Sequence, residues 1–567
     1  MNSKYLLAVF ILTATGAAMP TLGWAAAPTV TEQEQLRQLE RERVLREQLQ
    51  RTPDVRLGRP IVDLARQRIP TDETPCFPIR HIELKGELAE RFQWALGTAS
   101  TPDDSAVDRC LGANGINLVL RRVQNAIIAR GFVTTRVLAE PQDLKTGNLA
   151  LTLIPGRIRT VRFAEGTDNR ASSWNALPAR SGDLLNLRDI EQGLENFKRL
   201  PTADADIRIA PGDQPGESDV VIYWKQAFPF RLNVSVDDSG SKFTGKYLGG
   251  ITVAYDHMLT LNDLFYVSFN HDLGGGESGK KDSHGYTAHY SVPYGYWLLG
   301  FTTSDSTYQQ SVAGINQIYI YRGESQNSDV KLSRLVYRDA VRKTTFSLRG
   351  WTRASKNFID DTEIEIQRRR TAGWETGLGH REFIGFATLD LNLAYRRGTG
   401  AMDAISAPEE ASGAGASRLE LLTADAQFAL PFTLGSQSLR YSTVWRAQWN
   451  RTPLVPQERF AIGGRYTVRG FDGENILAAD RGWLLRNDLS WILGGSGQAL
   501  YLGLDYGEVG GPASTQLIGT RLSGAVLGLR GGYKGLTYDV FFGRPISKPQ
   551  GLKTADTTAG FNLNWSF

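Results

Sequence analysis

Histidines are the side chains best suited to bind a metal or transfer a proton, and the chain has six of them. They lie singly along the sequence, with no pair at the short spacing that places two metal ligands on one turn or helix face. They are His81, His257, His271, His284, His289 and His380. No nucleophile elbow and no pair of acid–base carboxylates stands out either. The sequence therefore predicts no catalytic residue, no bound metal, no cofactor and no enzymatic activity.

The stretch GGGESGKK, residues 274–281, comes close to a phosphate-binding loop. That motif needs serine or threonine after its lysine and a helix behind it. Here Lys281 occupies the hydroxyl position, and the following GYTAHYSV has the alternation of a strand. We interpret the stretch as a polar hairpin loop.

The two cysteines, Cys76 and Cys110, offer redox chemistry. In an exported protein an even number of cysteines indicates a disulfide. A bond across a loop of this length would stabilise its domain by roughly 3–4 kcal/mol in the chain-entropy model. Two isolated thiols are the alternative, and a two-cysteine metal site lacks a suitably spaced histidine.

The stretch GGRYTVRGFDGE, residues 463–474, places Arg469 between Val468 and Gly470, in a loop between strands. Further along, in ALYLGLDYGEV, apolar residues alternate with Asp505 and its neighbours Gly503 and Gly507. If the apolar face meets lipid, Asp505 points inward, because a charge facing lipid near the midplane costs a few kcal/mol. A loop folded inward could then set the Arg469 guanidinium against this carboxylate in two-point geometry. A solvated external loop is the alternative.

The region that carries these residues, 229–567, reads as a series of strands in which polar and apolar side chains alternate. Aromatic residues lie near the strand ends, as in a transmembrane β-barrel. The final strand shows the pattern well, with one apolar face formed by Phe561, Leu563, Trp565 and Phe567. Spanning strands need about 9–11 residues each, so the region suits about 16, although 14 or 18 also fit. A soluble β-sandwich also alternates and is the alternative fold.

Two shorter regions, 75–156 and 157–228, each read as strand, helix, strand, strand. In the first, IRHIEL, NGINLVLRRVQNAIIARG, FVTTRVL and GNLALTLI are the expected elements. In the second they are IRTVRF, LRDIEQGLENFKRLP, ADIRIA and SDVVIYW. Such tandem similarity indicates an internal repeat of a small α/β domain.

The N-terminus has the form of a secretory signal peptide, residues 1–26, with an apolar run closed by small residues. Residues 27–53 follow as one highly charged helix with a thin apolar stripe, in which Thr31 and Glu34 form a capping-box pattern. A coiled-coil piece or solvated arm and a movable helix inside a polar cavity both fit this composition. Residues 54–74 read as a linker. The formal net charge of +4, with both signs abundant, does not favour a nucleic-acid partner.

The motifs TVRGFDGE (467–474), LRNDL (485–489) and GLDYGEV (503–509) together resemble the signature loop and strands of two-partner secretion transporters, the TpsB family. CFPIRHIEL, GFVTTRV and PQDLKTGNLALTLIPGRI resemble the family's first POTRA domain, and the similarity covers essentially the whole mature chain in order. One departure is Gly503, where some members have an aromatic residue, with Tyr501 two residues earlier. This puts the packing around Asp505 in doubt, but not its charge.

The resemblance implies a barrel of 16 antiparallel strands with an in-folded signature loop at 456–480, two periplasmic POTRA domains and an N-terminal plug helix. It implies that Val468, Arg469, Gly470 and Phe471 form the loop motif, with Asp505 and Gly507 on the facing strand. The implied function is secretion of a large exoprotein, of haemolysin, adhesin or contact-dependent-inhibition toxin type, across the outer membrane of a Gram-negative bacterium.

The implied partners are that exoprotein, recognised unfolded by the POTRA domains, the lipid of the outer membrane and the barrel-assembly machinery that inserts the protein. We expect a monomer. A barrel-assembly insertase shares the loop motif but usually carries more POTRA repeats. A passive porin would need neither the tandem domains nor the loop–strand pair.

Overall fold

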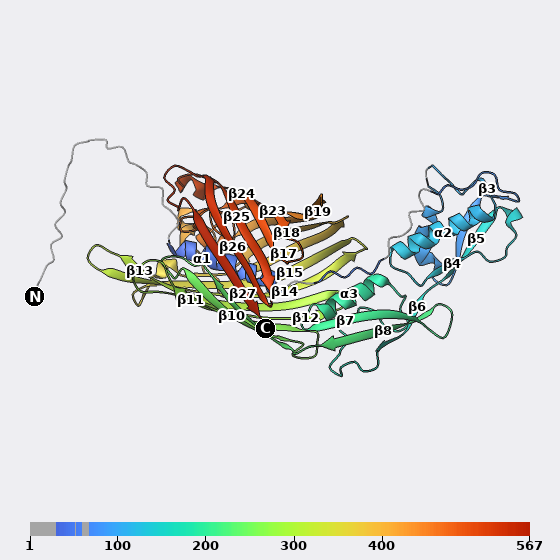
Figure 1. Cartoon of the computed structure of the whole chain (residues 1–567), viewed down its shortest axis with the longest axis horizontal. Helices are drawn as coiled ribbons and strands as arrows, with labels where there is room; N and C mark the ends of the chain where they lie inside the picture. The colour runs from blue at the N-terminus through green and yellow to red at the C-terminus, as the bar shows by residue number, and fades with distance from the viewer. Residues whose placement is uncertain (1–29, 51–52, 59–66, 102) are drawn as a thin grey trace, which may run out of the picture.

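The computed structural model describes residues 30–50, 53–58, 67–101 and 103–567. The expected signal peptide, 1–26, lies outside the described residues. Figure 1 shows a barrel that encloses one helix, with two small α/β domains extending from one end. Within the described residues, no helix is both long and apolar enough to cross a membrane.

The barrel confirms the predicted fold of sixteen long antiparallel strands, with each strand paired to the next along the chain. Its first half consists of β9 (Phe230–Asp237), β10 (Tyr247–Asp256), β11 (Leu264–Gly274), β12 (Lys281–Tyr294), β13 (Trp297–Ala313), β14 (Ile318–Arg338), β15 (Arg342–Ile359) and β17 (Arg369–Ile384). Its second half consists of β18 (Ala387–Thr399), β19 (Glu420–Leu434), β20 (Gln437–Asn450), β23 (Arg481–Ile492), β24 (Ala499–Gly510), β25 (Arg521–Tyr533), β26 (Leu536–Ser547) and β27 (Thr558–Ser566). The two-residue β16 (Thr362–Glu363) extends the hairpin after β15.

The barrel closes where the last strand meets the first, with Asn562 of β27 opposite Asp237 of β9. Closure removes the free edges that a sheet cannot leave unpaired in lipid. The predicted outward face of the last strand is exposed, with Leu563, Trp565 and Phe567 at 37%, 50% and 65%. Phe561 of the same face is half-buried. The stretch 274–281 lies in the connection between β11 and β12, so it is the predicted hairpin loop and no helix follows it.

The first α/β domain contains a three-stranded sheet in the order β2 (His81–Gly86), β5 (Asn148–Ile154), β4 (Arg136–Leu138). Its helix α2 (Ala113–Ala129) packs on that sheet through Leu118, Val119, Val123 and Ile127. The other elements are the short strands β1 (Phe77–Ile79) and β3 (Arg109–Leu111) and the 3-10 segments η2 (Ala89–Thr98) and η3 (Leu144–Thr146).

Two details of this domain differ from the sequence analysis. The analysis did not anticipate η2, whose Phe92 is buried in the domain core. The predicted strand at 132–138 shortens to β4, because Phe132 packs edge-on against Phe92 and the Thr135 hydroxyl accepts a hydrogen bond from the Gly156 amide. Tertiary packing therefore overrides the strand propensity of residues 132–135.

The second α/β domain repeats the topology, with a sheet in the order β6 (Arg157–Phe163), β8 (Glu217–Gln226), β7 (Ala203–Pro211) and the helix α3 (Leu187–Lys198). In both domains the first strand runs parallel to the last, and the strand between them in sequence forms the antiparallel edge. Ile190, Leu194 and Phe197 of α3 pack in the core, as the helical periodicity predicted.

The second domain contacts the barrel directly, whereas the first extends away from it (Figure 1). Asn175 donates to the Pro293 carbonyl at 3.1 Å, and Arg199 donates to the Asn262 carbonyl at 2.9 Å. These contacts identify the barrel end that bears the turns after β10 and β12 as the end facing the α/β domains. The resemblance implies that these domains lie in the periplasm, so the opposite end is the expected exterior end.

Candidate functional site

A loop between β20 and β23 folds back into the barrel and carries Arg469 (Figure 1 labels β23, the strand that follows it). The loop includes the short strands β21 (Phe460–Ile462) and β22 (Leu477–Ala479), which pair with each other. The Arg469 side chain is 5% exposed, so the solvated-loop alternative does not apply to this residue.

Arg469 meets the carboxylate of Asp505 on β24 in two-point geometry. Its Nε and one terminal nitrogen donate to Asp505 at 2.7 and 2.8 Å, and its backbone amide donates to the same carboxylate at 2.9 Å. The same terminal nitrogen also donates to Asp488 on β23 at 2.6 Å. Since a charged pair of this kind is stable in a buried place only when its hydrogen bonds are satisfied, these contacts fix the loop against the barrel wall.

Glycines let the loop backbone approach the wall. A Cβ at Gly524 of β25 would lie 1.9 Å from the Arg469 carbonyl oxygen, and one at Gly507 would lie 2.8 Å from a methyl of Val468. Gly470 has a φ of 96° and faces the Arg544 carbonyl oxygen. Side chains at these positions would collide with the loop or strain its backbone.

The middle of the loop also packs through apolar side chains. Val468 and Phe471, at 0% and 4% exposed, enter a cluster on β23, β24 and β25. The cluster comprises Ile462, Val468, Phe471, Leu477, Ala479, Leu484, Val509, Leu522 and Leu552. Burial of each large aliphatic or aromatic side chain contributes about 1.5–3 kcal/mol, so apolar packing and the arginine–aspartate pair fix the loop together.

Residues on either side of the Val468–Phe471 turn contact the place where the first and last barrel strands meet. Arg465 donates to Asp238 and to the Phe561 carbonyl oxygen, each at 2.6 Å. Glu474 accepts from the Lys242 amide at 2.8 Å. The predicted barrel-closing residue Phe561 therefore takes part in loop docking through its backbone.

Helix α1 (Val30–Leu49) lies inside the barrel and crosses the lumen (Figure 1). Its contacts to the wall are polar: Arg46 pairs with Asp329 of β14 at 2.9 Å, and Glu40 pairs with Arg446 of β20 at 3.2 Å. Glu42 accepts from Ser304 at 3.0 Å. The structure therefore agrees with the interpretation of this charged helix as one inside a polar cavity. It does not agree with the interpretation as a solvated arm.

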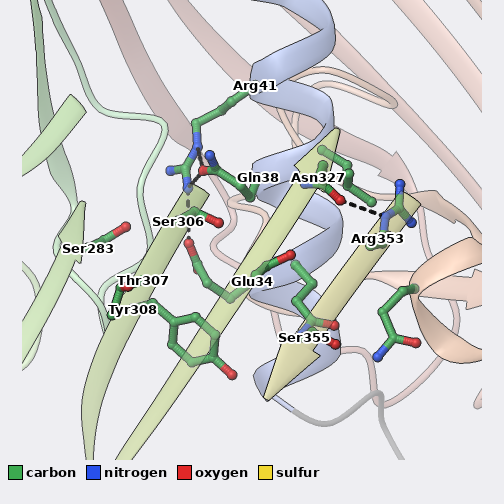
Figure 2. A pocket seen from close by; sticks show the side chains of 14 residues that line it. Glu34, Gln38, Arg41, Ser283, Ser306, Thr307, Tyr308, Asn327, Arg353 and Ser355 are labelled. Carbon is green, nitrogen blue, oxygen red and sulfur yellow. Dashed lines mark hydrogen bonds and ion pairs between the residues drawn. The ribbon is translucent and has the colours of Figure 1, made fainter. Parts of the chain in front are cut away.

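The predicted capping box of this helix is wrong. The helix already includes Val30, so Thr31 lies inside it rather than at its cap. The Glu34 carboxylate instead accepts hydrogen bonds from Arg37 at 2.7 Å and Arg41 at 3.1 Å (Figure 2). Arginines further along the same helix therefore hold this carboxylate, together with the Thr244 hydroxyl of the barrel at 3.3 Å.

Figure 2 shows a polar cavity between α1 and the barrel wall toward the exterior. Its lining includes Glu34, Gln38, Arg41, Ser306, Asn327 and Arg353. The side-chain amide of Gln35 and one terminal nitrogen of Arg41 are buried without a hydrogen-bond partner among the described residues. Within the described part of the chain, polar atoms of α1 are therefore left unpaired beside this cavity.

A hydrogen bond joins the helix to the loop. Arg37 of α1 donates to the Gly473 carbonyl oxygen of the loop at 2.7 Å. At the other end of the helix, Gln50 donates to Tyr266 at 3.1 Å. The helix therefore lies between the tip of the loop and the periplasmic side of the barrel.

The segment that follows α1 is clamped between α3 and a barrel turn. The backbone amides of Val55 and Leu57 donate to Glu195 and Glu191 of α3 at 2.8 and 2.7 Å. Arg338 at the end of β14 pairs with both glutamates, at 3.1 and 2.9 Å. The part of the predicted linker that the structure describes here is ordered by charge, a role that its composition did not indicate.

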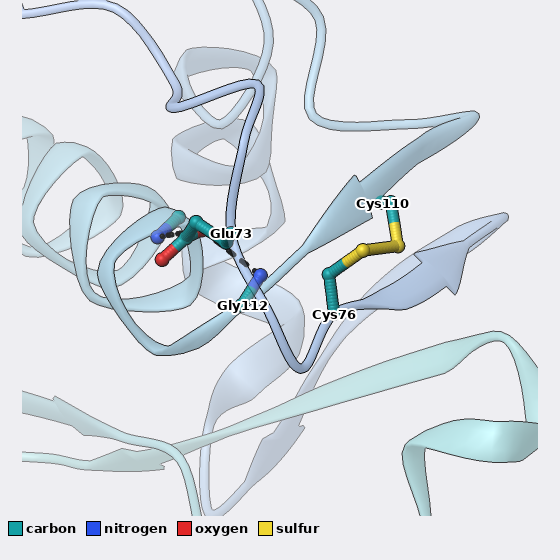
Figure 3. The surroundings of a disulfide bond; sticks show 5 residues. Glu73, Cys76, Cys110 and Gly112 are labelled. Carbon is teal, nitrogen blue, oxygen red and sulfur yellow. Dashed lines mark hydrogen bonds between the residues drawn. A yellow bond between two sulfur atoms is a disulfide. The ribbon is translucent and has the colours of Figure 1, made fainter.

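Cys76 and Cys110 form a disulfide in the first α/β domain, with their Cα atoms 5.3 Å apart (Figure 3). Beside it, the Glu73 carboxylate accepts from the backbone amides of Gly112, Asn114 and Gly115 at the start of α2. The disulfide and Glu73 therefore fix the N-terminal edge of this domain to its helix.

The sequence analysis found no two histidines at metal-ligand spacing along the chain, but strand pairing brings one pair together. His271 of β11 lies directly opposite His284 of β12 in the antiparallel register, with Asp282 beside them. Spacing along the chain misses such a pair, because its partners come from two strands joined by a loop.

Comparison with known proteins places the chain among outer-membrane transporters. A family model described as "Haemolysin secretion/activation protein ShlB/FhaC/HecB" matches residues 216–531. A ShlB-type POTRA model matches residues 77–156 and a second POTRA model matches residues 157–211.

Individual relatives agree with the family models. The "Outer membrane transporter CdiB-2" of Burkholderia pseudomallei is 39% identical, over 99% of this chain and 98% of the relative. The CdiB transporter of Dickeya dadantii is 29% identical, over 95% and 94%. Among solved structures, CdiB from Acinetobacter baumannii matches with a TM-score of 0.83 and 31% identity, over 96% of this chain and all of that chain.

Proposed function

Because the chain belongs to the ShlB/FhaC/HecB family of outer-membrane two-partner secretion transporters, we propose that it secretes one large exoprotein through the lumen that α1 now occupies. The exoprotein is of the haemolysin, adhesin or contact-dependent-inhibition toxin type. The observation that carries the proposal is the contrast between a charged helix held by polar contacts in a polar lumen and a loop fixed to the wall of the same lumen.

The α/β domains would receive the unfolded exoprotein in the periplasm. Within the described residues, β4 and β7 are edge strands of their sheets. An extended chain can add to such an edge through backbone hydrogen bonds, with little demand on its sequence. This mode suits a substrate that arrives unfolded and whose length exceeds any single binding site.

Helix α1 would then leave the barrel. Its wall contacts are ion pairs and hydrogen bonds to polar side chains, which water and an incoming polar chain can replace. The linker clamp at Val55 and Leu57 would stay at the periplasmic rim, so that the helix is displaced but not lost. Folding of the exoprotein outside the cell would make passage directional.

Deletion of the gene, followed by an inventory of secreted and outer-membrane proteins, tests the proposal. We expect the loss of one large exoprotein from the medium and an unchanged set of outer-membrane barrels, with both restored by the wild-type gene. A general loss of barrels would instead support an insertase and would contradict the proposal. An unchanged inventory of secreted proteins would also contradict it.

A further inference from the structure

Two histidines and an aspartate converge on the outer face of the barrel where β11 and β12 pair. The rings of His271 and His284 are nearly parallel, with centroids 5.9 Å apart and planes 15° apart. The Asp282 carboxylate lies 3.6 Å from His271 Nε2 and 2.8 Å from His284 Nδ1. One donor atom from each of the three residues lies within 4.8 Å of the other two.

The surroundings prepare these atoms to bind a cation. His271 Nδ1 lies 2.6 Å from the Asp272 carbonyl oxygen. A carbonyl only accepts, so Nδ1 carries the hydrogen and Nε2 presents its lone pair toward Asp282. Metal-binding histidines are oriented in the same way by a carbonyl or carboxylate on the other ring nitrogen.

Asp282 supplies the third donor of the cluster. Its Oδ1 atom is buried and has no hydrogen-bond partner among the described residues. A buried carboxylate oxygen without a donor is costly, and a cation placed between Asp282 and the lone pair of His271 Nε2 would satisfy it.

The cluster lies on the outward face near the exterior end of β11 and β12. It faces outward like Phe269 and Tyr286, which precede His271 and follow His284 by two residues on the same strands. It lies next to the hairpin loop on the exterior side, and His271 and His284 are largely exposed. A hydrated cation can therefore reach it from outside the cell.

We propose that His271, Asp282 and His284 bind one divalent transition-metal cation of the zinc class, with water at the remaining position. Two imidazoles and one carboxylate are ligands suited to zinc, copper or nickel, whereas calcium and magnesium prefer an all-oxygen set. The bound cation would join β11 to β12 beside their loop. That loop touches the rest of the exterior rim through the Glu277 amide, which donates to the Lys242 carbonyl oxygen at 2.8 Å.

The test is zinc titration of the full-length, tag-free protein in detergent after removal of metals with a chelator. We expect one saturable equivalent of Zn²⁺. His271→Ala and His284→Ala should each weaken binding by at least about tenfold, the scale reported even for loss of an outer-shell partner. The matched control is His380→Ala: His380 also has a nearby carboxylate, 3.9 Å away on Glu382, but is not part of the cluster.

Two readouts keep the result interpretable. Migration of unheated samples on denaturing gels reports whether each variant retains a folded barrel. Electron paramagnetic resonance of Cu²⁺ bound at the site should show coupling to two imidazole nitrogens in the wild type and to one in either cluster variant. Equal zinc affinity in a folded His271→Ala variant, or the absence of saturable binding to the wild type, would overturn the proposal.

Discussion

The in-folded loop and helix α1 both occupy the lumen, yet different kinds of interaction hold them against the barrel wall. The loop enters an apolar cluster, pairs Arg469 with two carboxylates and approaches the wall at glycines that leave no room for a side chain. The helix touches the wall through dispersed ion pairs and hydrogen bonds. The difference indicates that the loop is a permanent part of the pore and the helix a removable one.

Loss of the arginine at the loop should have the largest effect. Arg469→Ala leaves Asp505, which is 4% exposed, with the backbone amide of residue 469 and with Arg486, 3.9 Å away, as its nearest remaining arginine. Breaking a buried pair in this way costs about 3–5 kcal/mol. We expect secretion of the cognate exoprotein to fall at least about tenfold, while the barrel still inserts into the outer membrane.

The matched control for this variant is Arg521→Ala, which removes an exposed arginine paired with Glu508 at 3.1 Å on the same sheet. Secretion should then stay within the wild-type range, because exposed pairs contribute about 0–1 kcal/mol. Wild-type secretion by the Arg469→Ala variant would contradict the role assigned to the loop.

Loss of one helix contact should have a small effect. In Arg46→Ala the partner Asp329 keeps its second arginine, Arg349, at 2.7 Å, so no carboxylate is left without a charge partner. Because Asp329 keeps a charged partner, the cost stays below the about 3–5 kcal/mol of a buried pair that loses its partner. We expect the open fraction of single channels in planar bilayers to rise by at most about fivefold, with secretion nearly unchanged. A loss of secretion as large as that in Arg469→Ala would erase the distinction between loop and helix.

The sequence anticipated the loop better than the helix for a physical reason. Strand side chains alternate with period two, so the apolar neighbours of Asp505 are enough to point it inward. The partners of α1 depend on how the helix is rotated and how far it is inserted, which its nearly uniform charge does not specify. The pairing of Arg46 with Asp329 therefore has no signal in the sequence.

The histidine pair was missed for a related reason. Its two members face each other because of the register across the β11–β12 hairpin. That register depends on the shape of a glycine-rich loop, whose backbone the sequence leaves free. Likewise η2 packs into the first α/β domain through contacts distant in sequence, such as that of Phe92 with Phe132.

The account's central claim, that the helix leaves the pore while the loop stays, can be tested by linking each to the wall. Arg46 with Asp329 and Arg465 with Asp238 are matched arginine–aspartate pairs at 2.9 and 2.6 Å, one on the helix and one on the loop. Each pair is replaced by two cysteines and joined by the same reducible bis-thiol linker, and secretion is measured before and after reduction. Wild-type cells given the same reductant control for the native disulfide.

We predict that the helix link blocks secretion until it is reduced and that the loop link does not. Undiminished secretion through the linked helix would contradict the claim.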